Sequence, residues 1–209
     1  MTAPAPQPAP RGSTGYEDAA WLEITAPISA AELRNFLDDI ERLYRINPQL
    51  EISAFEATGA NTYRLTARNL ANGREIDVLL AVTPSDRAVE VGYSQGLKVS
   101  TSFRAEPADG GARLFVTDVY GRVSEAERRA RVGEVDLSLN AWGRALHDYL
   151  RVWARWKWLA PWRWYMRRVW QPMTPSARRI VWMIWVVSAF EVAALAALLA
   201  IWLSLRWLA

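Results

Sequence analysis

The sequence predicts an α+β domain, a seven-stranded antiparallel sheet wrapped on a long C-terminal helix, followed by one transmembrane helix. Three observations lead to this prediction. Short runs of alternating apolar and polar residues, separated by turn residues, fill the region between residues 50 and 120. A periodic apolar stripe follows from Leu139 to Trp153. The end of the 209-residue chain is almost free of charge.

The first elements are a short strand and a helix. The strand is expected over residues 19–25. Ser29 and Glu32 have the spacing of a helix-capping box. The helix after them shows apolar residues at helical intervals, namely Leu33, Phe36, Leu37, Ile40 and Leu43. Asn47-Pro48 ends this helix, because the residue before a proline disfavours the α conformation.

Six further strands and a long helix are expected next. Asn72-Gly73 between the second and third of these strands is a strong hairpin signal. After Gly121, Ser124 and Glu127 form a second capping box, although Gly133 weakens the early part of the helix. From Asp136 the apolar face is regular, and it consists of Leu139, Trp142, Leu146, Tyr149, Leu150 and Trp153.

This order of elements over residues 19–158 resembles the START-like superfamily, also known as the SRPBCC, helix-grip or polyketide cyclase/dehydrase type. The resemblance rests on the element order and on the helix Leu33–Ile40 before Asn47-Pro48. It implies an apolar cavity between the sheet and the final helix, as in coenzyme-Q-binding members of the superfamily. No cofactor is expected beyond a bound lipid or quinone.

Several polar side chains alternate with apolar residues on the expected strands and are candidates for facing this cavity. They are Tyr63, Tyr93, Thr101, Asp118 and Tyr120. An apolar cavity with a few polar groups is typical of sites that orient an apolar ligand by its head group. The alternative is that these groups satisfy one another or lie at strand ends in solvent.

Charge is unevenly distributed along the chain, and this predicts its organisation. The net charge is −5 over residues 1–142, +8 over residues 143–179 and zero over residues 180–209. We expect a disordered Pro/Ala-rich leader over residues 1–18 without the apolar segment of a signal peptide. The START-like domain then covers residues 19–158, a basic Trp-rich neck covers residues 159–174, and the transmembrane helix covers residues 175–209.

The predicted transmembrane helix begins at Thr174-Pro175, an N-cap followed by a first-turn proline. A helix over residues 180–205 is roughly 39 Å long at 1.5 Å per residue, enough to cross a hydrocarbon core of about 30 Å. Because the basic residues lie before the span, the positive-inside rule places the N-terminal domain in the cytoplasm. The prediction is a single-pass protein of the inner or plasma membrane; a buried core helix is the alternative.

The stretch over residues 152–173, which includes most of the neck, alternates tryptophan with basic residues, a pattern typical of a segment that lies on anionic lipid. The residues expected at the membrane surface are Trp156, Trp162, Arg163, Trp164, Arg167, Arg168 and Trp170. A protein partner is the first alternative. Stacking of nucleic-acid bases on the tryptophans is disfavoured by the nearby span, so no nucleic-acid partner is expected.

Glu191 lies midway along the predicted span, where a charged side chain is costly and usually faces a partner. Ala189, Ala193 and Ala197 form a nearby row of small residues that allows close helix approach. We expect a contact with another integral-membrane subunit or a second copy of the chain. The alternative is a simple anchor with a protonated Glu191.

No catalytic motif is present. The chain has no cysteine and a single histidine, His147, which excludes thiolate and multi-histidine metal sites. His147 beside Asp148 is interpreted as a boundary residue with a local hydrogen bond, and a catalytic base is the alternative. We therefore expect no metal, no catalytic residue and no enzymatic activity.

Two functions remain. The first is a membrane-anchored START-like module that binds or presents an apolar ligand, of lipid or quinone type, at the cytoplasmic membrane face. The second is an accessory subunit of an integral-membrane complex with no role in ligand transfer. An enzyme of the polyketide-cyclase type is a third and weaker interpretation, because fold does not imply function.

Overall fold

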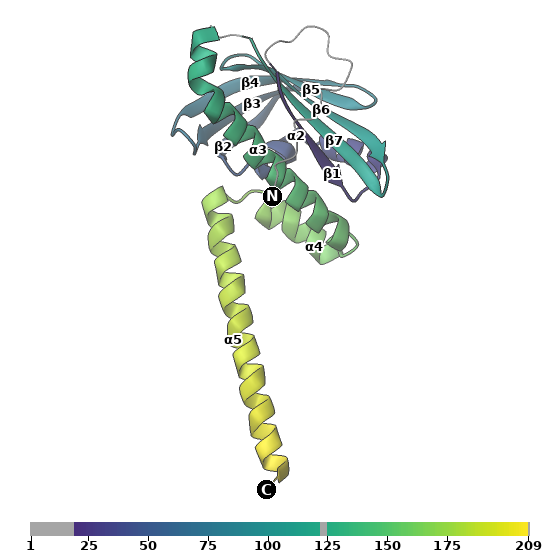
Figure 1. Ribbon diagram of the computed structural model, residues 1–209, viewed down its shortest axis with the longest axis vertical. Coiled ribbons are helices and arrows are strands. Elements are labelled where there is room, and N and C mark those ends of the chain that lie inside the picture. Colours follow the sequence, from purple (N-terminus) through teal and green to yellow (C-terminus); the bar gives the residue numbers. More distant parts are fainter. Residues whose placement is uncertain (1–18, 122–124, 209) are drawn as a thin grey trace, which may run out of the picture.

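The sheet has seven strands, and the long helix α3 crosses its face (Figure 1). This computed structural model describes residues 19–121 and 125–208, with side chains described for residues 19–121 and 138–206. The strands are β1 (Ala19–Ala26), β2 (Leu50–Gly59), β3 (Thr62–Asn69), β4 (Glu75–Pro84), β5 (Ala88–Tyr93), β6 (Lys98–Ala108) and β7 (Gly111–Tyr120). The helices are α1 (Ala30–Leu37), α2 (Ile40–Ile46), α3 (Glu125–Trp156), α4 (Ala160–Tyr165), the π-helix η1 (Met166–Trp170) and α5 (Pro175–Leu208).

The strand order β1-β7-β6-β5-β4-β3-β2 is antiparallel throughout. Strands β2 to β7 follow one another as hairpins, while β1 pairs with β7 at the far edge. The hairpin predicted at Asn72-Gly73 is confirmed, with Gly73 at φ +70°, a conformation that glycine adopts without steric cost. The predicted α+β helix-grip architecture is therefore confirmed.

The single helix predicted before the second strand is in fact two short helices. The chain breaks at Asp38–Asp39, where the Asp39 carboxylate accepts a hydrogen bond from the backbone N–H of Arg42 at 3.1 Å and caps α2. An aspartate cap competes with continuation of the preceding helix, which sequence periodicity does not register. The apolar spacing still holds, because Leu33, Phe36 and Leu43 are all buried in the core.

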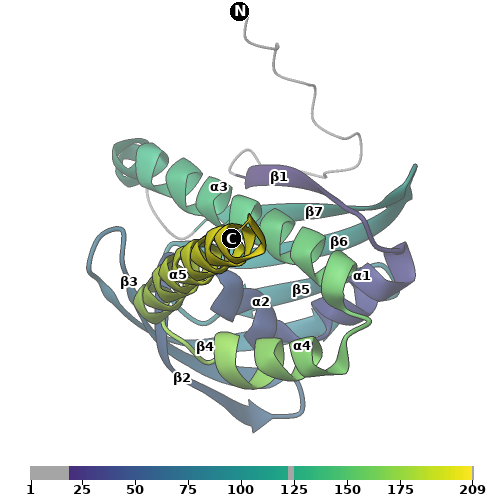
Figure 2. The same ribbon diagram turned by 90° about the horizontal axis from the view of Figure 1, so that it is seen from below.

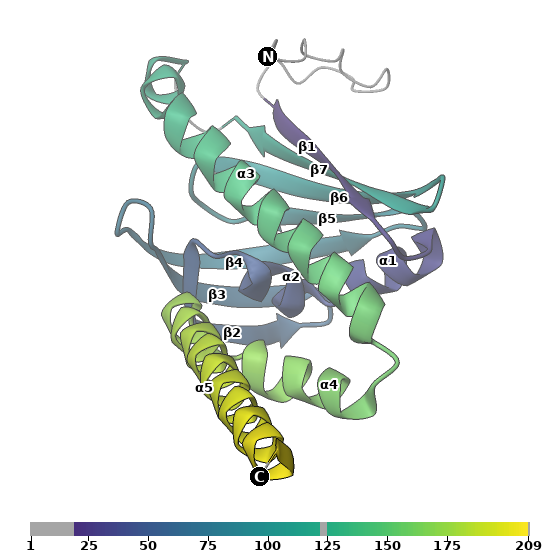
Figure 3. The ribbon, with the colours of Figure 1, turned by 60° about the horizontal axis from the view of Figure 1, so that its bottom comes forward.

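Helix α3 begins earlier than the regular stripe indicated, at Glu125, and Gly133 does not interrupt it. One glycine costs a helix only about 1 kcal/mol, which its neighbouring turns can offset. Ser124 of the predicted capping box and the leader over residues 1–18 lie outside the described residues. The predicted stripe is buried from Leu139 to Trp153, so α3 packs its apolar face on the sheet (Figure 3).

A cage of aromatic rings around the Arg42 guanidinium joins α2 to α3. Arg42 is only 4% exposed, and its guanidinium lies 4.2 Å from the Trp153 ring centroid and 4.7 Å from that of Phe36. Its Nε and Nη2 donate to the hydroxyl of Tyr149 at 2.9 and 2.7 Å. Cation–π contacts on desolvated rings together with these hydrogen bonds compensate the buried charge.

After α3 the chain turns back through α4 and η1, which lie beside the end of α3, and then enters α5 (Figure 2). Arg178 in the first turns of α5 donates to three backbone carbonyls, those of Arg45 at 2.7 Å, Gln171 at 2.9 Å and Trp170 at 3.1 Å. These carbonyls lie at the ends of α2 and η1, where helices lack internal donors. Arg178 therefore ties α5 to the domain.

Helix α5 leads away from the domain (Figure 1). It begins at Pro175 as predicted, and the Thr174 hydroxyl accepts from the N–H of Ala177 at 3.2 Å. Of the helices in the described part of the chain, α5 has the length and apolar composition to cross a membrane. Its most apolar stretch has a mean hydropathy of 2.3 and no buried residue.

Candidate functional site

Four of the five predicted ligand-binding residues form one hydrogen-bonded chain on the face of the sheet that α3 covers. The Asp118 carboxylate is fully buried and accepts from the Thr101 hydroxyl at 2.5 Å and the Tyr120 hydroxyl at 3.1 Å. The Thr101 and Tyr93 hydroxyls are 2.9 Å apart. Thr101 and Asp118 are cross-strand partners of β6 and β7, so strand alternation brings them to one face.

Two residues of this hydrogen-bonded network were not predicted from the sequence. The Lys98 ammonium donates to the second Asp118 oxygen at 2.5 Å, and the Tyr44 hydroxyl of α2 lies 2.6 Å from that of Tyr93. Regular alternation would place Lys98 and Thr101 on opposite faces, because they are three residues apart. A β-bulge between Lys98 and Ser100 brings them to the same face.

The sequence holds one weak signal for Lys98. It is one of only two lysines among 25 basic residues, the other being Lys157. Both lysines form ion pairs, Lys98 with Asp118 and Lys157 with Glu32. A rare residue type at the start of a strand suggests a specific role for Lys98, but it does not predict that Asp118 is its ion-pair partner. We call Lys98, Asp118, Thr101, Tyr93, Tyr120 and Tyr44 the buried polar cluster.

The fifth predicted residue, Tyr63, lies outside this cluster. It is half-buried on β3, where its ring packs 5.3 Å from that of Phe55. Tyr63 pairs with Leu80 of β4, and Leu80 pairs in turn with Tyr93 of β5. The two tyrosines therefore lie in one row across the sheet, with the fully buried Leu80 between them.

Burial and charge keep the cluster in a defined protonation state. Burial raises the pKa of the Tyr44, Tyr93 and Tyr120 phenols above their usual value, so that they remain neutral. Burial alone would lower the pKa of the Lys98 ammonium, but the charge of Asp118 raises it above its usual value. The cluster therefore combines one ion pair with neutral hydroxyls, which can donate or accept hydrogen bonds.

The cluster borders the apolar core at Trp142. The Lys98 ammonium lies 5.7 Å from the centroid of this ring, and the indole N–H donates to the carbonyl of Leu43 at 3.0 Å. The Lys98 side chain is 25% exposed, whereas that of Asp118 is not exposed at all. An ammonium has three donors, so Lys98 is the member of the cluster best placed to meet a polar group of a bound molecule.

His147 is not part of this cluster. Its Nδ1 lies 3.0 Å from the carbonyl oxygen of Thr25 on β1, so its hydrogen bond is to a distant strand instead of to Asp148. Within the described residues, no group of three or more histidine, cysteine or acidic side chains could hold a metal ion.

The tryptophans and arginines predicted at the membrane surface divide into two groups. Trp162 and Trp170 pack against the core of the domain. Trp164 is 62% exposed, and the remaining predicted residues are exposed as well, namely Trp156, Arg163, Arg167 and Arg168. The neck is therefore partly a structural element that joins α3 to α5.

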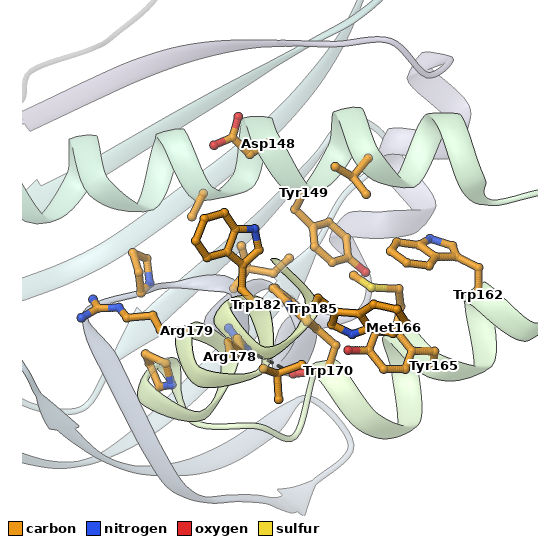
Figure 4. Close-up of a pocket in the computed structure, with 16 residues that line it drawn as sticks. Asp148, Tyr149, Trp162, Tyr165, Met166, Trp170, Arg178, Arg179, Trp182 and Trp185 are labelled. Carbon is orange, nitrogen blue, oxygen red and sulfur yellow. Dashed lines mark hydrogen bonds between the residues drawn. The ribbon is translucent and has the colours of Figure 1, made fainter. Parts of the chain in front are cut away.

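On α5, the predicted partner-contact residues are all exposed, namely Glu191, Ala189, Ala193 and Ala197. A groove of about 670 Å³ lies where α3, the α4–η1 segment and the first turns of α5 meet (Figure 4). Sequence reasoning missed it, because its walls come from four separate parts of the chain. We call it the junction groove.

Breaking the buried ion pair should destabilise the domain. Lys98→Met is expected to lower the free energy of unfolding by about 3 kcal/mol, because Asp118 stays buried without its counter-charge. Adding Asp118→Asn should recover about half of that loss, since no uncompensated charge remains. Urea denaturation of the full chain in mild detergent, monitored by tryptophan fluorescence, measures the free energy of unfolding of both variants.

The matched control for this experiment is Arg64→Met, which breaks the exposed pair of Arg64 with Asp77. Its effect should be much smaller, because exposed pairs contribute little. An equal effect of Lys98→Met and Arg64→Met would contradict a special role of the buried pair.

Alkaline pH should also destabilise the domain. For Lys98, Tyr44 and Tyr93 the folded pKa lies above the unfolded one, so their contribution is complete below the unfolded pKa and is lost as pH rises toward the folded pKa. We expect the free energy of unfolding to fall as pH rises above about 10. Tyr44→Phe with Tyr93→Phe should reduce the slope; a slope identical to wild type would count against the assignment.

Solved structures share this architecture. The Zhui aromatase/cyclase from Streptomyces sp. R1128 matches with a TM-score of 0.52 and 12% identity, covering 68% of this chain and 96% of that chain. TTHA0849 from Thermus thermophilus matches with a TM-score of 0.49 and 16% identity, covering 64% and 95%. Ara h 8.0201 matches with a TM-score of 0.42 and 20% identity, covering 63% and 96%. No protein-family model and no curated protein matches the sequence.

These comparisons overturn the expectation that the protein is not an enzyme. The structural neighbours include an aromatase/cyclase. The sequence argument rested on the lack of a local catalytic motif, whereas the fold gathers Lys98, Asp118 and Tyr120 from positions that show no such motif. At this level of identity the likeness shows the fold, and the domain formed by the sheet and α3 has the helix-grip fold.

Proposed function

We propose that this protein is a START-like module that binds an apolar molecule by its polar end, at a membrane surface to which α5 anchors it. The observation that carries the proposal is the buried polar cluster around Asp118. The ligand class is a lipid or quinone-type molecule. The polar end of that molecule would meet Lys98 and its neighbouring hydroxyls, with the apolar part against the core between the sheet and α3.

The energetic argument starts from the cost of the cluster. A buried ion pair contributes little net stability, and apolar residues of similar volume often replace one without loss. Asp118 is fully buried and Lys98 is mostly buried, and the pair borders the apolar core at Trp142. Few polar groups in an otherwise apolar interior are what fixes the orientation of an apolar ligand. The cluster thus fits a role in ligand recognition better than a role in stability.

The membrane part of the proposal rests on α5 and on the charge before it. Large apolar side chains such as Phe190 and Leu195 are exposed on α5, which water disfavours. Arg163, Arg167 and Arg168 precede the helix and are exposed, which favours the cytoplasmic side of the membrane. A membrane would cover the apolar surface of α5 and place the domain near dissolved apolar ligands.

The test is organic extraction of the full chain, purified in mild detergent, followed by mass spectrometry. We expect about one apolar molecule per chain, and we expect occupancy to fall about tenfold when Tyr93→Phe and Asp118→Asn remove hydrogen bonds near the head group. Tyr63→Phe is the matched control, because it removes a hydroxyl from the same sheet but outside the buried polar cluster. The chain should also remain with the membrane after an alkaline wash.

Unchanged occupancy in the double variant would overturn the assignment of the buried polar cluster as the head-group site. A wild-type chain without any bound molecule would overturn ligand binding as the function. Release by the alkaline wash would overturn anchoring. The identity of the extracted compound also shows whether it is a candidate substrate for an enzyme. A substrate is worth testing for, because the Zhui aromatase/cyclase has a similar fold.

One observation favours a second candidate, an accessory subunit of a membrane complex. Glu191 is exposed on α5 in an otherwise apolar stretch, and a carboxyl group inside a membrane usually faces a partner. The row of Ala189, Ala193 and Ala197 would allow a second helix to approach closely.

The second candidate predicts that Glu191→Leu weakens the recovery of partners in mild detergent by about tenfold, since one interhelical hydrogen bond is lost. Quantitative mass spectrometry of the co-purified membrane proteins measures it. Glu191→Gln is the matched control, because it keeps a hydrogen-bonding side chain of the same size at this position and should retain the partners. Equal recovery of partners with wild type and Glu191→Leu would exclude this contact.

A further inference from the structure

The junction groove is lined almost entirely by apolar and aromatic side chains. Trp162, Tyr165 and Trp170 of the α4–η1 segment form one wall, and Trp182 and Trp185 of α5 form another (Figure 4). Val152 of α3 also lines the groove. Its volume of about 670 Å³ is in the range of small-molecule and cofactor sites. The groove is therefore large enough for an extended apolar chain.

We propose that the junction groove binds an acyl chain of an anionic membrane phospholipid, whose phosphate lies beside Arg179. This inference rests on the membrane anchoring in the proposed function, but not on ligand binding at the buried polar cluster. The lipid would come from the bilayer that surrounds α5 and would fix the domain against the membrane surface.

The exposure of the groove walls favours an apolar occupant. Trp182 and Trp185 are each 67% exposed, and Val152 is 41% exposed. Soluble proteins rarely leave a contiguous apolar patch of this kind open to water. Because Trp182 and Trp185 belong to α5 itself, the groove continues directly into the surface of the helix that would cross the bilayer. An acyl chain can therefore reach it without leaving the membrane.

Charge at the rim selects an anionic head group. Arg178 also borders the groove, but its guanidinium is taken up by three backbone carbonyls. Arg179 is exposed and makes no hydrogen bond or ion pair with another described residue, and Figure 4 shows it extending away from the aromatic side chains. Asp148 of α3 is the one acidic residue among those that line the groove, and two basic residues, Arg178 and Arg179, line it as well. Basic residues at this depth attract anionic lipid.

The groove is separate from the buried polar cluster. Ala145, Asp148 and Val152 of α3 line the groove, whereas Trp142, Leu146 and Leu150 of the same helix are buried in the core beneath it. Tyr149 lines the groove and also belongs to the buried stripe, but no residue of the buried polar cluster lines the groove. A substitution in one can be judged without altering the contacts of the other.

The experiment uses the full chain in nanodiscs of equimolar phosphatidylcholine and phosphatidylglycerol, released for native mass spectrometry. Wild type should retain one phospholipid, with phosphatidylglycerol preferred. Val152→Asp places a charge on the groove wall at an exposed position and should lower retention about tenfold, because a bound acyl chain would bury the carboxylate against apolar surface. Ala145→Phe fills the groove from α3 and should do the same.

Arg179→Gln should keep the lipid but lower the preference for phosphatidylglycerol about fivefold. Arg206→Gln, at the other end of α5, is the matched control and should behave like wild type. Retention unchanged in both Val152→Asp and Ala145→Phe would overturn the site, and an unchanged preference in Arg179→Gln would overturn its anionic selectivity.

The proposed function can fail independently. Asp118→Asn should leave the retained phospholipid unchanged, since Asp118 does not line the groove. If the buried polar cluster proves empty while the phospholipid remains in the groove, ligand binding fails and the lipid site stands. If the chain does not enter nanodiscs, anchoring fails and the lipid site fails with it.

Discussion

The structure depends on the burial of one apolar face of α3 against the sheet, and Trp142 is at the centre of that contact. Its ring lies 5.4 Å from those of Tyr44 and Phe103, so it joins α2, α3 and β6. Its indole N–H donates to the carbonyl of Leu43, which keeps a polar atom satisfied in an apolar setting. Burying an aromatic side chain of this size contributes about 2–3 kcal/mol from area alone. Without this contact the sheet would have an open apolar face.

The same contact explains why a charged pair can exist inside the domain. The ring of Trp142 covers the Lys98 ammonium, and the bulge in β6 brings Lys98 to the side of Asp118. Hydroxyls of Thr101 and Tyr120 complete the hydrogen bonds of the carboxylate. A fully connected polar network in a core specifies one arrangement, because any partial arrangement would leave a buried charge unsatisfied. This rigidity suits the head-group site that we propose for the buried polar cluster.

The basic aromatic neck contains two kinds of side chain, those that pack against the core and those that are exposed, and its composition does not distinguish them. Inward-facing side chains such as Trp170 join the core, where its ring lies 5.4 Å from that of Tyr149. Arg178 then fixes the first turns of α5 to the ends of α2 and η1. Outward-facing Trp164 and Arg168 remain free to meet a surface. The domain and α5 are therefore connected by a packed joint, so that a membrane around α5 would orient the domain.

Local periodicity and turn chemistry predicted the strands, the hairpin at Asn72-Gly73, the stripe of α3 and the apolar length of α5 from the sequence alone. Regular alternation along the strands likewise predicted that Thr101, Asp118, Tyr93 and Tyr120 share one face. The place of Lys98 beside them depends on the folded structure, because a bulge breaks that alternation. The folded structure also decided that Asp39 splits the first helix and that four distant segments form the junction groove, because such contacts depend on how elements meet in space.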